Sequence, residues 1–361
     1  MKVVYFSLMP GLGGPARSLA GLLEGLAGRV ERTVVVPPGR FSQLLRKGGF
    51  AERIVELPLS RSGRLGRLGV ATLVARLIRN ADLLHCNGHT ELLVASASVL
   101  VQRRPVIAHM RTTQMTGWSS YAAPLWPFLG NRVPWIAVSE FAKRELSRLG
   151  VAGESVDVVP NPISLSAVVG LPRREKPAFT VGYFGSRRTV KGFRLLPEIA
   201  RRLSKEGVIL RVYSESDKTG NPAANDDIAD RLLEFSPFVE FVGQQMDLRG
   251  EYSSCNVVLS PSLRESFGRV PVEALANGIP VVASDIPAFR VLADASRAVE
   301  LFDLERPEEA AACIIQLRND TDRYDAMAAR GPPFASAFQP QTVADKIIEI
   351  YHRVLTGHAL R

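Results

Sequence analysis

Two glutamates, Glu265 and Glu273, lie in one stretch of the chain and are separated by seven residues. That spacing is common by chance, so the surrounding residues decide what it means. A β-branched run ends near Ser260, a loop passes Phe267 and Gly268, and a helical pattern that contains Glu273 follows. This order predicts that Glu265 lies beside a helix N-terminus at the carboxyl edge of a parallel sheet, where open α/β folds bind ligands.

The same stretch offers three kinds of polar group at that edge. The Glu265 carboxylate can accept hydrogen bonds from sugar hydroxyls, and Glu273 could accept a bidentate pair from a ribose diol. Backbone N–H groups near Phe267 and Gly268 would face phosphate oxygens at the helix start. The stretch therefore suits a ligand that combines a sugar, a phosphate and a ribose.

A glycine-rich loop near the N-terminus is a second candidate anion site. Gly13 and Gly14 follow an apolar run and precede a helical pattern that Pro15 suits as an early residue. The N–H groups and positive end of such a helix attract phosphate. The dinucleotide fingerprint is excluded, because its third glycine and its later acidic residue are missing. A plain tight turn remains the alternative.

Three cations and a histidine complete the candidate set. Lys191, with Arg187 and Arg188 before it, could neutralise a diphosphate, or all three could be ordinary surface cations. His109 ends an apolar run, where it is either a catalytic group or a histidine satisfied within the fold.

Metal-binding patterns are weak. His85 and His89 form a pair without a third ligand. Asp320 and Asp322 form an Asp-x-Asp motif, but in a polar helical segment, so we interpret them as solvated. The three cysteines are widely spaced without a CxxC pattern, which fits a reducing cytoplasm and indicates neither disulfides nor a metal site.

The elements that must position these residues alternate between β-branched runs and helical patterns, which predicts parallel sheets covered on both faces. Expected strands of the first half cover 3–8, 33–37, 82–86, 106–109, 135–138 and 156–159. Those of the second half cover 179–184, 208–213, 239–242, 256–260 and 280–283, with helical patterns at 192–205 and 270–277. The fold class is therefore α/β, with two doubly wound Rossmann-like domains.

A linker divides the two domains. Residues 168–177 contain two prolines, a glycine and a charge cluster, so we expect an N-terminal domain over 1–170 and a C-terminal domain over 171–340. The chain of 361 residues is long enough for both. A final helical segment, 341–361, carries an apolar stripe from Val343 to Leu355 that should pack on another element.

The positive charge is confined to the first half. Residues 1–170 contain 20 Lys and Arg against 10 Asp and Glu, whereas 171–361 contain 25 against 26. The alternatives are an anionic partner or a solvated basic face. Zinc-finger and RNP-like patterns are missing, so nucleic acid is disfavoured and an anionic membrane surface or a phosphorylated ligand remains. No apolar stretch reaches the roughly 20 residues of a membrane span.

One segment of the first half combines basic and aromatic residues that would suit docking on an anionic leaflet, although the aromatics could equally be domain core. Its basic members are Arg61, Arg64, Arg67, Arg76 and Arg79, and its aromatic members, near Arg111, are Trp118, Tyr121, Trp126, Phe128 and Trp135.

These motifs resemble the retaining glycosyltransferases of the large family usually numbered four, whose signature has two glutamates seven residues apart with an inner Phe-Gly and a trailing Ala-x-Gly-x-Pro-Val. The resemblance covers nearly the whole chain and implies a GT-B fold with the active site in a cleft between the domains and a last helix crossing back onto the first. Other matching features, in order, are Gly13-Gly14, Asp82-Leu-Leu-His85-Cys-Asn-Gly88, His109, Val138-Ser139-Glu140, Val159-Pro160-Asn161, and Gly185 with Lys191-Gly192.

The resemblance implies a role for each matching residue. Glu265 would hold the donor sugar's hydroxyls, Glu273 the ribose, and Lys191 the leaving diphosphate. His109 would lie against the sugar near the reacting carbon. The family's usual Arg five residues before the lysine is Ser186 here, so Arg187 or Arg188 must reach instead. The family's Asn-Gly turn after the strand at 156–159 is Asn161-Pro162 here.

The implied activity is metal-independent, retaining transfer of a hexose-like sugar from a nucleotide diphosphate, with UDP-sugar favoured and no cofactor. The expected acceptor is a lipid-linked or polysaccharide-precursor glycan of the cell envelope, and the expected location is cytoplasmic, with peripheral contact to the inner membrane face. Three rivals remain: a non-catalytic sugar-nucleotide-binding subunit, a nucleotide-sugar epimerase, and a glycoside hydrolase, whose two carboxyls would lie about 5–9.5 Å apart.

Overall fold

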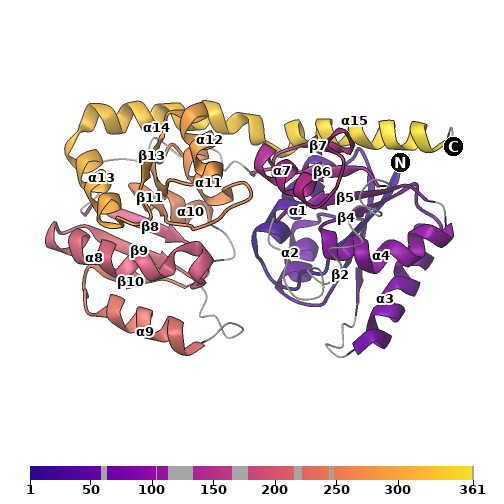
Figure 1. Ribbon diagram of the computed structural model, residues 1–361, viewed down its shortest axis with the longest axis horizontal. Coiled ribbons are helices and arrows are strands. Elements are labelled where there is room, and N and C mark those ends of the chain that lie inside the picture. The colour runs from indigo at the N-terminus through magenta and orange to yellow at the C-terminus, as the bar shows by residue number, and fades with distance from the viewer. Residues whose placement is uncertain are drawn as a thin grey trace. The chain divides into compact units, whose positions relative to one another are not determined.

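The computed structural model describes residues 1–57, 63–102, 104–112, 133–164, 178–214, 222–243, 245 and 248–359. The chain forms two compact units (Figure 1). Unit 1 comprises Met1–Ser164 together with Phe338–Arg361, and unit 2 comprises Leu165–Ala337. The borders between the units fall at 164 and 337, where sequence reasoning places them at 170 and 340.

Unit 1 is built on a seven-stranded parallel sheet in the order β3-β2-β1-β4-β5-β6-β7. Six strands confirm the prediction, and the edge strand β3 was missed because its short sequence, Arg-Ile-Val-Glu, is polar at both ends and nowhere fully buried. The strands are β1 (Lys2–Phe6), β2 (Glu31–Val36), β3 (Arg53–Glu56), β4 (Leu83–Cys86), β5 (Val106–Met110), β6 (Trp135–Ala137) and β7 (Val156–Val158).

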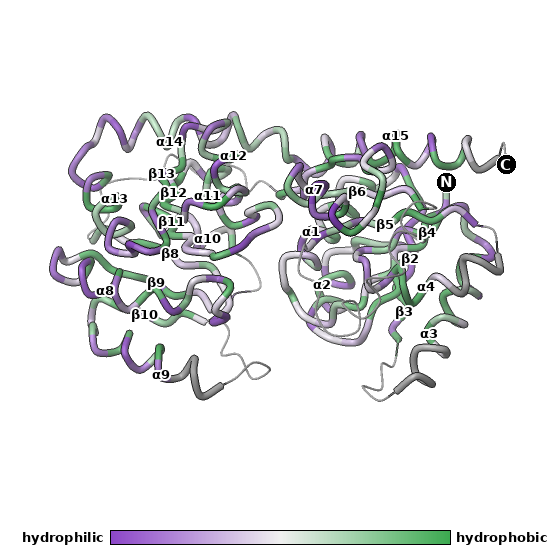
Figure 2. Tube along the Cα trace, in the orientation of Figure 1, coloured by the Kyte–Doolittle hydropathy of each residue, from purple (hydrophilic) through white to green (hydrophobic). Residues whose placement is uncertain are grey.

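Helices flank this sheet: α1 (Gly14–Gly25), α2 (Arg40–Gly48), α3 (Gly63–Ile78), α4 (His89–Gln102), α7 (Glu140–Arg148) and α15 (Pro340–Ala359). The first and last of them pack against each other. Hydrophobic and hydrophilic residues alternate along α15 (Figure 2), and Val343, Ile347 and Tyr351 are buried as the stripe predicts. Gly25 lets the two helices approach, because a Cβ there would lie 2.1 Å from the Pro340 carbonyl oxygen.

Replacing Gly25 with Ala should destabilise unit 1, because the added methyl group would force α1 away from α15. Overpacking of this kind typically costs about 1–3 kcal/mol. All three tryptophans lie within residues 1–164, so urea unfolding followed by Trp fluorescence reports on unit 1. Gly357→Ala is the matched control, since nothing lies within 4 Å of a Cβ at that site. Equal midpoints for the two variants would contradict the prediction.

Unit 2 has a six-stranded parallel sheet in the order β10-β9-β8-β11-β12-β13. Five strands confirm the prediction, and the edge strand β13 was missed because Glu300 interrupts its apolar run. The strands are β8 (Thr180–Phe184), β9 (Ile209–Tyr213), β10 (Val239–Phe241), β11 (Val257–Ser260), β12 (Val281–Ser284) and β13 (Val299–Phe302).

The helices of unit 2 are α8 (Leu196–Lys205), α9 (Pro222–Leu233), α10 (Arg249–Ser253), α11 (Arg269–Ala276), α12 (Pro287–Ser296), α13 (Glu308–Asn319) and α14 (Thr321–Ala335). The helix expected over 270–277 is confirmed as α11. The one expected from residue 192 begins later, because Gly192 has a φ of +72° between two short 3-10 turns. Asp320 and Asp322 are exposed, and Asp320 caps α14 by accepting a 3.0 Å hydrogen bond from the Arg323 N–H.

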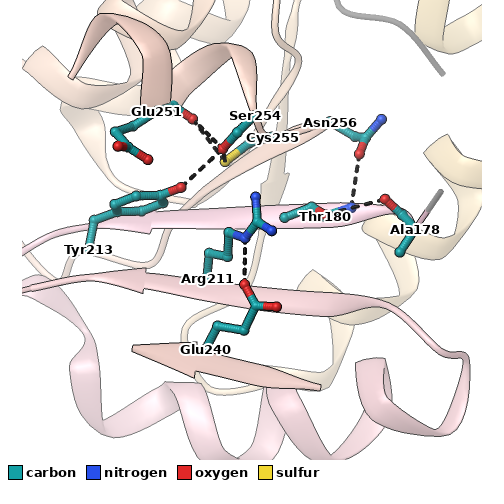
Figure 3. A network of polar contacts seen from close by, with 9 residues as sticks. All are labelled: Ala178, Thr180, Arg211, Tyr213, Glu240, Glu251, Ser254, Cys255 and Asn256. Carbon is teal, nitrogen blue, oxygen red and sulfur yellow. Dashed lines mark hydrogen bonds and ion pairs between the residues drawn. The ribbon is translucent and has the colours of Figure 1, made fainter. Parts of the chain in front are cut away.

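Polar contacts fasten the strands of unit 2 to one another (Figure 3). Asn256, just before β11, accepts a 2.9 Å hydrogen bond from the first N–H of β8. Arg211 of β9 pairs with Glu240 of β10 at 2.6 Å. The Tyr213 hydroxyl, at the end of β9, lies 3.0 Å from the Ser254 hydroxyl. These contacts fix the strands whose carboxyl ends carry the loops of the candidate site.

Candidate active site

The loop that follows β8 is anchored so that Lys191 points at the loop that follows β11. The buried Tyr183 hydroxyl donates to the Ser186 carbonyl at 2.8 Å and lies 3.3 Å from that of Lys191. Burial, and then the nearby Glu265 charge, raise the pKa of Tyr183, so its phenol stays a donor. At Gly192 a Cβ would lie 1.8 Å from the Pro261 carbonyl oxygen, so only glycine fits.

Lys191 and Glu265 form an ion pair at this point. Lys191 Nζ lies 2.5 Å from Glu265 Oε1, and the Ser262 hydroxyl donates to the same oxygen at 3.0 Å. The lysine side chain is 36% exposed and the glutamate side chain 18%. A small pocket beside the pair is lined by both residues together with Phe184, Gly185 and others. The structure thus joins a cation and a carboxylate that lie 74 residues apart in sequence.

Glu273 is held on α11 by two neighbours. Its carboxylate pairs with Arg269 Nε at 2.7 Å and accepts a 2.6 Å hydrogen bond from the Tyr252 hydroxyl. Tyr252 stacks on Phe184, which stacks on Tyr213, with 4.3 Å between ring centroids in each case. An aromatic stack therefore fixes the second glutamate of the motif relative to the ends of β8 and β9.

The start of α11 presents backbone rather than side-chain donors. Gly268, with a φ of +86°, is the N-cap residue, and no side chain caps the helix there. A Cβ at Gly268 would lie 2.9 Å from Phe289 and 3.0 Å from Leu292, so the turn requires glycine. Phe267 is buried next to it. The first N–H groups of α11 are the kind of group that binds phosphate at a helix N-terminus.

The two candidate arginines differ in their surroundings. The Arg187 guanidinium lies over the rings of Phe241 and Phe193, at 5.0 and 5.8 Å from their centroids, and its Nε donates to Ser214 at 3.3 Å. Arg188 is exposed. Arg187 is therefore pre-oriented at the carboxyl edge of the sheet of unit 2, whereas Arg188 is not.

In unit 1 the glycine loop opens α1 without a side-chain cap. Gly13 is the N-cap residue in extended conformation, and a Cβ at Gly14 would meet nothing within 4 Å. Asn87, after β4, donates to the Pro15 carbonyl at 3.3 Å and so ties the helix start to the sheet. The loop therefore lies at the carboxyl edge of this sheet.

His109 lies at the end of β5 within a buried polar network. Its Nδ1 lies 3.2 Å from His85 Nε2, and its Nε2 has no hydrogen-bond partner among the described residues. Burial, then the charge of Arg111, hold the pKa of His85 and that of His109 well below the ordinary value, so both rings are neutral at neutral pH. A neutral imidazole whose Nε2 has no partner among the described residues can donate a hydrogen bond to a ligand or accept one from it.

Arg111 follows His109 and is buried between two amides. Its Nε donates to the Asn87 side chain at 3.0 Å and its Nη1 to that of Asn161 at 2.7 Å. The Asn161-Pro162 turn, which departs from the resembled pattern, therefore supplies a side-chain oxygen that holds a cation at the carboxyl edge.

Family models match both halves of the chain. The model described as Glycosyltransferase Family 4 matches residues 12–167, and the one described as Glycosyl transferases group 1 matches residues 178–320. The chain belongs to this glycosyltransferase family.

Relatives of this glycosyltransferase include the phosphatidyl-myo-inositol mannosyltransferase of Mycobacterium leprae, 28% identical over 319 residues that make up 83% of each chain. The D-inositol 3-phosphate glycosyltransferase of Corynebacterium kroppenstedtii is 32% identical over 48% of this chain and 40% of its own. Anabaena HepE, in complex with UDP and glucose, superposes with a TM-score of 0.83 at 22% identity, covering 97% of this chain and 99% of its own. The predicted GT-B class, with two Rossmann-like domains, is confirmed.

Sequence reasoning on the glycosyltransferase missed residues that hold the predicted ones in place. Tyr252 carried no motif signal, and Tyr351 was expected only as part of the apolar stripe of the last helix, because the polar contacts of both form only in the folded chain. Asn87 lies within the matching feature at 82–88 but was given no role, and Glu91 was not singled out; their position just after β4 was the available signal. Glu91 is buried and accepts a 2.8 Å hydrogen bond from the Leu8 N–H.

The predicted membrane-docking segment lies mostly outside the described residues. Arg61, Trp118, Tyr121, Trp126 and Phe128 lie outside the described residues, as do the side chains of Arg64 and Arg67. Trp135 is fully buried, so it belongs to the core of unit 1. None of the helices in the described ranges is long and apolar enough to span a membrane.

Unit 1 should lose stability as the pH falls below about 6.5, the ordinary histidine pKa. His85 and His109 are neutral in the folded chain, and burial lowers the pKa of His89 to about 4. Below about pH 6.5 the unfolded chain therefore binds more protons than the folded chain. Stability therefore rises with pH over this window, by up to about 1.4 kcal/mol per pH unit for each histidine, and levels off above it.

Urea unfolding followed by Trp fluorescence across that window measures the slope. His109→Asn should reduce the slope, and His352→Asn should leave it unchanged because His352 is exposed on α15. An identical slope in wild type and His109→Asn would refute the assignment of a buried neutral imidazole.

Proposed function

We propose that the protein transfers a sugar, with retention of anomeric configuration, from a UDP-sugar or similar nucleotide-diphosphate donor to a lipid-linked or polysaccharide-precursor acceptor. The observation that carries the proposal is the ion pair of Lys191 with Glu265, at the carboxyl edge of the sheet and beside the uncapped start of α11. A carboxylate for sugar hydroxyls thus lies next to a cation and N–H groups for phosphate.

The donor half of the reaction needs positive potential for the departing diphosphate. Lys191, the oriented Arg187 and the N–H groups of α11 supply it as fixed charges and dipoles. Preorganised donors of this kind are worth roughly 3–4 kcal/mol each in other enzymes. With these groups in place, the proposed reaction needs no metal, and EDTA should leave the rate unchanged.

The anomeric configuration is retained because the acceptor attacks the same face of the sugar from which the leaving group departs. The bond from the anomeric carbon to the diphosphate oxygen breaks, the acceptor oxygen bonds to the same face, and the acceptor proton passes to the leaving phosphate. No protein base is needed for that proton. Glu265 would hold hydroxyls of the sugar, Glu273 the ribose, and His109 a sugar hydroxyl near the reacting carbon.

The acceptor class is supported by the relatives and by the charge. Two of the relatives are named a phosphatidyl-myo-inositol mannosyltransferase and a D-inositol 3-phosphate glycosyltransferase. The excess of Lys and Arg lies within residues 1–170 of this chain. An acceptor with a phosphate group, presented from an anionic leaflet that the enzyme touches peripherally, suits that half. Sedimentation with anionic vesicles at low salt distinguishes this acceptor from a free glycan.

Donor turnover is the decisive test. The purified protein is incubated with UDP-, GDP-, ADP- and TDP-sugars while nucleotide release is followed. We expect release from one donor, and a loss of about a hundredfold or more in kcat in both Glu265→Gln and Lys191→Met. Glu198→Gln, in an exposed ion pair on α8, is the control and should keep full activity. Binding without release in the wild type would favour a non-catalytic sugar-nucleotide-binding subunit.

The two arginines can be separated by nucleotide affinity. Arg187→Lys keeps the charge but loses the guanidinium that lies over the Phe241 ring, so the Kd for the nucleotide should rise about tenfold. Arg188→Ala should change it less than about twofold, since an exposed charge is screened. Calorimetric titration with the nucleoside diphosphate measures both. A larger effect at Arg188 would assign the phosphate contact to that residue instead.

A further inference from the structure

Four buried side chains of unit 1 form one continuous chain of hydrogen bonds that ends at His109. Tyr5 lies on β1, His85 on β4, His109 on β5 and Tyr351 on α15. Tyr5 and His85 are direct partners in the parallel pairing of β1 with β4. His85 pairs with Ile107, two residues before His109, so all three strand residues face the same side of the sheet.

The contacts are short enough to fix each ring. His85 Nδ1 lies 2.7 Å from the Tyr351 hydroxyl, and His85 Nε2 lies 3.2 Å from His109 Nδ1. The Tyr351 hydroxyl donates to the Tyr5 hydroxyl at 3.3 Å. Each of the four residues is at most 1% exposed. Among the described residues, these partners decide where the hydrogens of the four side chains lie.

The donor and acceptor roles along this series of hydrogen bonds follow from the Tyr351 phenol, on the side of His85 opposite His109. Because Tyr351 gives its hydrogen to Tyr5, its oxygen can only accept from His85, which places the His85 hydrogen on Nδ1. His85 is neutral, so its Nε2 is a lone pair that accepts from His109 Nδ1–H. The remaining nitrogen, His109 Nε2, is then a buried acceptor with no partner among the described residues.

We propose that Tyr351 is a positioning residue that acts through His85 and holds His109 in the tautomer whose Nε2 accepts a hydrogen bond from a hydroxyl of the bound sugar. That the ligand is a sugar rests on the proposed function, whereas the assignment of the His109 tautomer does not. Tyr351 comes from the C-terminal helix, so α15 contributes to the chemistry of unit 1 as well as to its packing.

The tautomers can be read directly by NMR, because the chain has only five histidines. The full-length protein is labelled with nitrogen-15 at histidine, and signals are assigned with His85→Asn and His109→Asn. The wild type should show a protonated Nδ1 and a bare Nε2 for both His85 and His109. Tyr351→Phe should convert both to a mixture of tautomers. A protonated Nε2 on wild-type His109, or no change in Tyr351→Phe, would overturn the proposal.

A second variant tests the direction. Tyr5→Phe removes the acceptor of the Tyr351 hydrogen, which should turn to His85 Nδ1 and move the protons of both imidazoles to Nε2. The control is Tyr324→Phe, which loses an equally buried phenol that donates to the Asn256 carbonyl in unit 2. The control should leave every histidine signal in place. Unaltered His109 signals in Tyr5→Phe would refute the relay even if Tyr351→Phe fails to fold.

Activity provides an independent readout. Tyr351→Phe should lower kcat about tenfold, the effect of one misplaced hydrogen bond, while the Kd for the nucleoside diphosphate stays unchanged. An equal loss in nucleotide affinity would indicate a general structural effect and contradict the positioning role. If wild type turns over no donor, the proposed function fails, and the NMR result still decides the tautomer.

Discussion

The ion pair between Lys191 and Glu265 depends on a backbone approach that only glycine permits. The chain at Gly192 passes the Pro261 carbonyl so closely that a Cβ would lie 1.8 Å from that oxygen. This contact brings the loop after β8 against the loop after β11. The positive and negative groups of the candidate site can then meet, with Lys191 at the end of a short 3-10 turn. The small residue in the motif therefore positions the two charged ones.

Parallel strand pairing brings the candidate site residues together in both units. Because every strand of each sheet runs the same way, all loops that follow the strands gather at one edge. In unit 1 this edge brings His109 and Arg111, at the end of β5, together with Asn161 after β7. The register of β1 with β4 adds Tyr5 beside His85. Burial then keeps the two imidazoles uncharged, so they act through hydrogen-bond direction rather than through charge.

The sequence predicts most of the fold and the residues of the site that carry motifs, such as Glu265 and Lys191. Eleven strands of the two sheets follow from β-branched runs, and the missed ones, β3 and β13, are edge strands with charged residues and thus lack the signal of a buried strand. Glu265 and Lys191 could be paired only through the family resemblance. The polar contacts of Tyr252 and Tyr351 could not be predicted, because their partners lie 21 and 266 residues away and only folding brings them together.

The membership of α15 in unit 1 also sets an order of events during synthesis. Residues 1–164 leave the ribosome long before residues 338–361, with all of unit 2 between them. Until the last segment emerges, the face of α1 that receives α15 stays uncovered, and His85 has no phenol from Tyr351. The first unit to be translated is thus the last to be completed. A chain truncated before residue 338 therefore contains all of unit 2 but an incomplete unit 1.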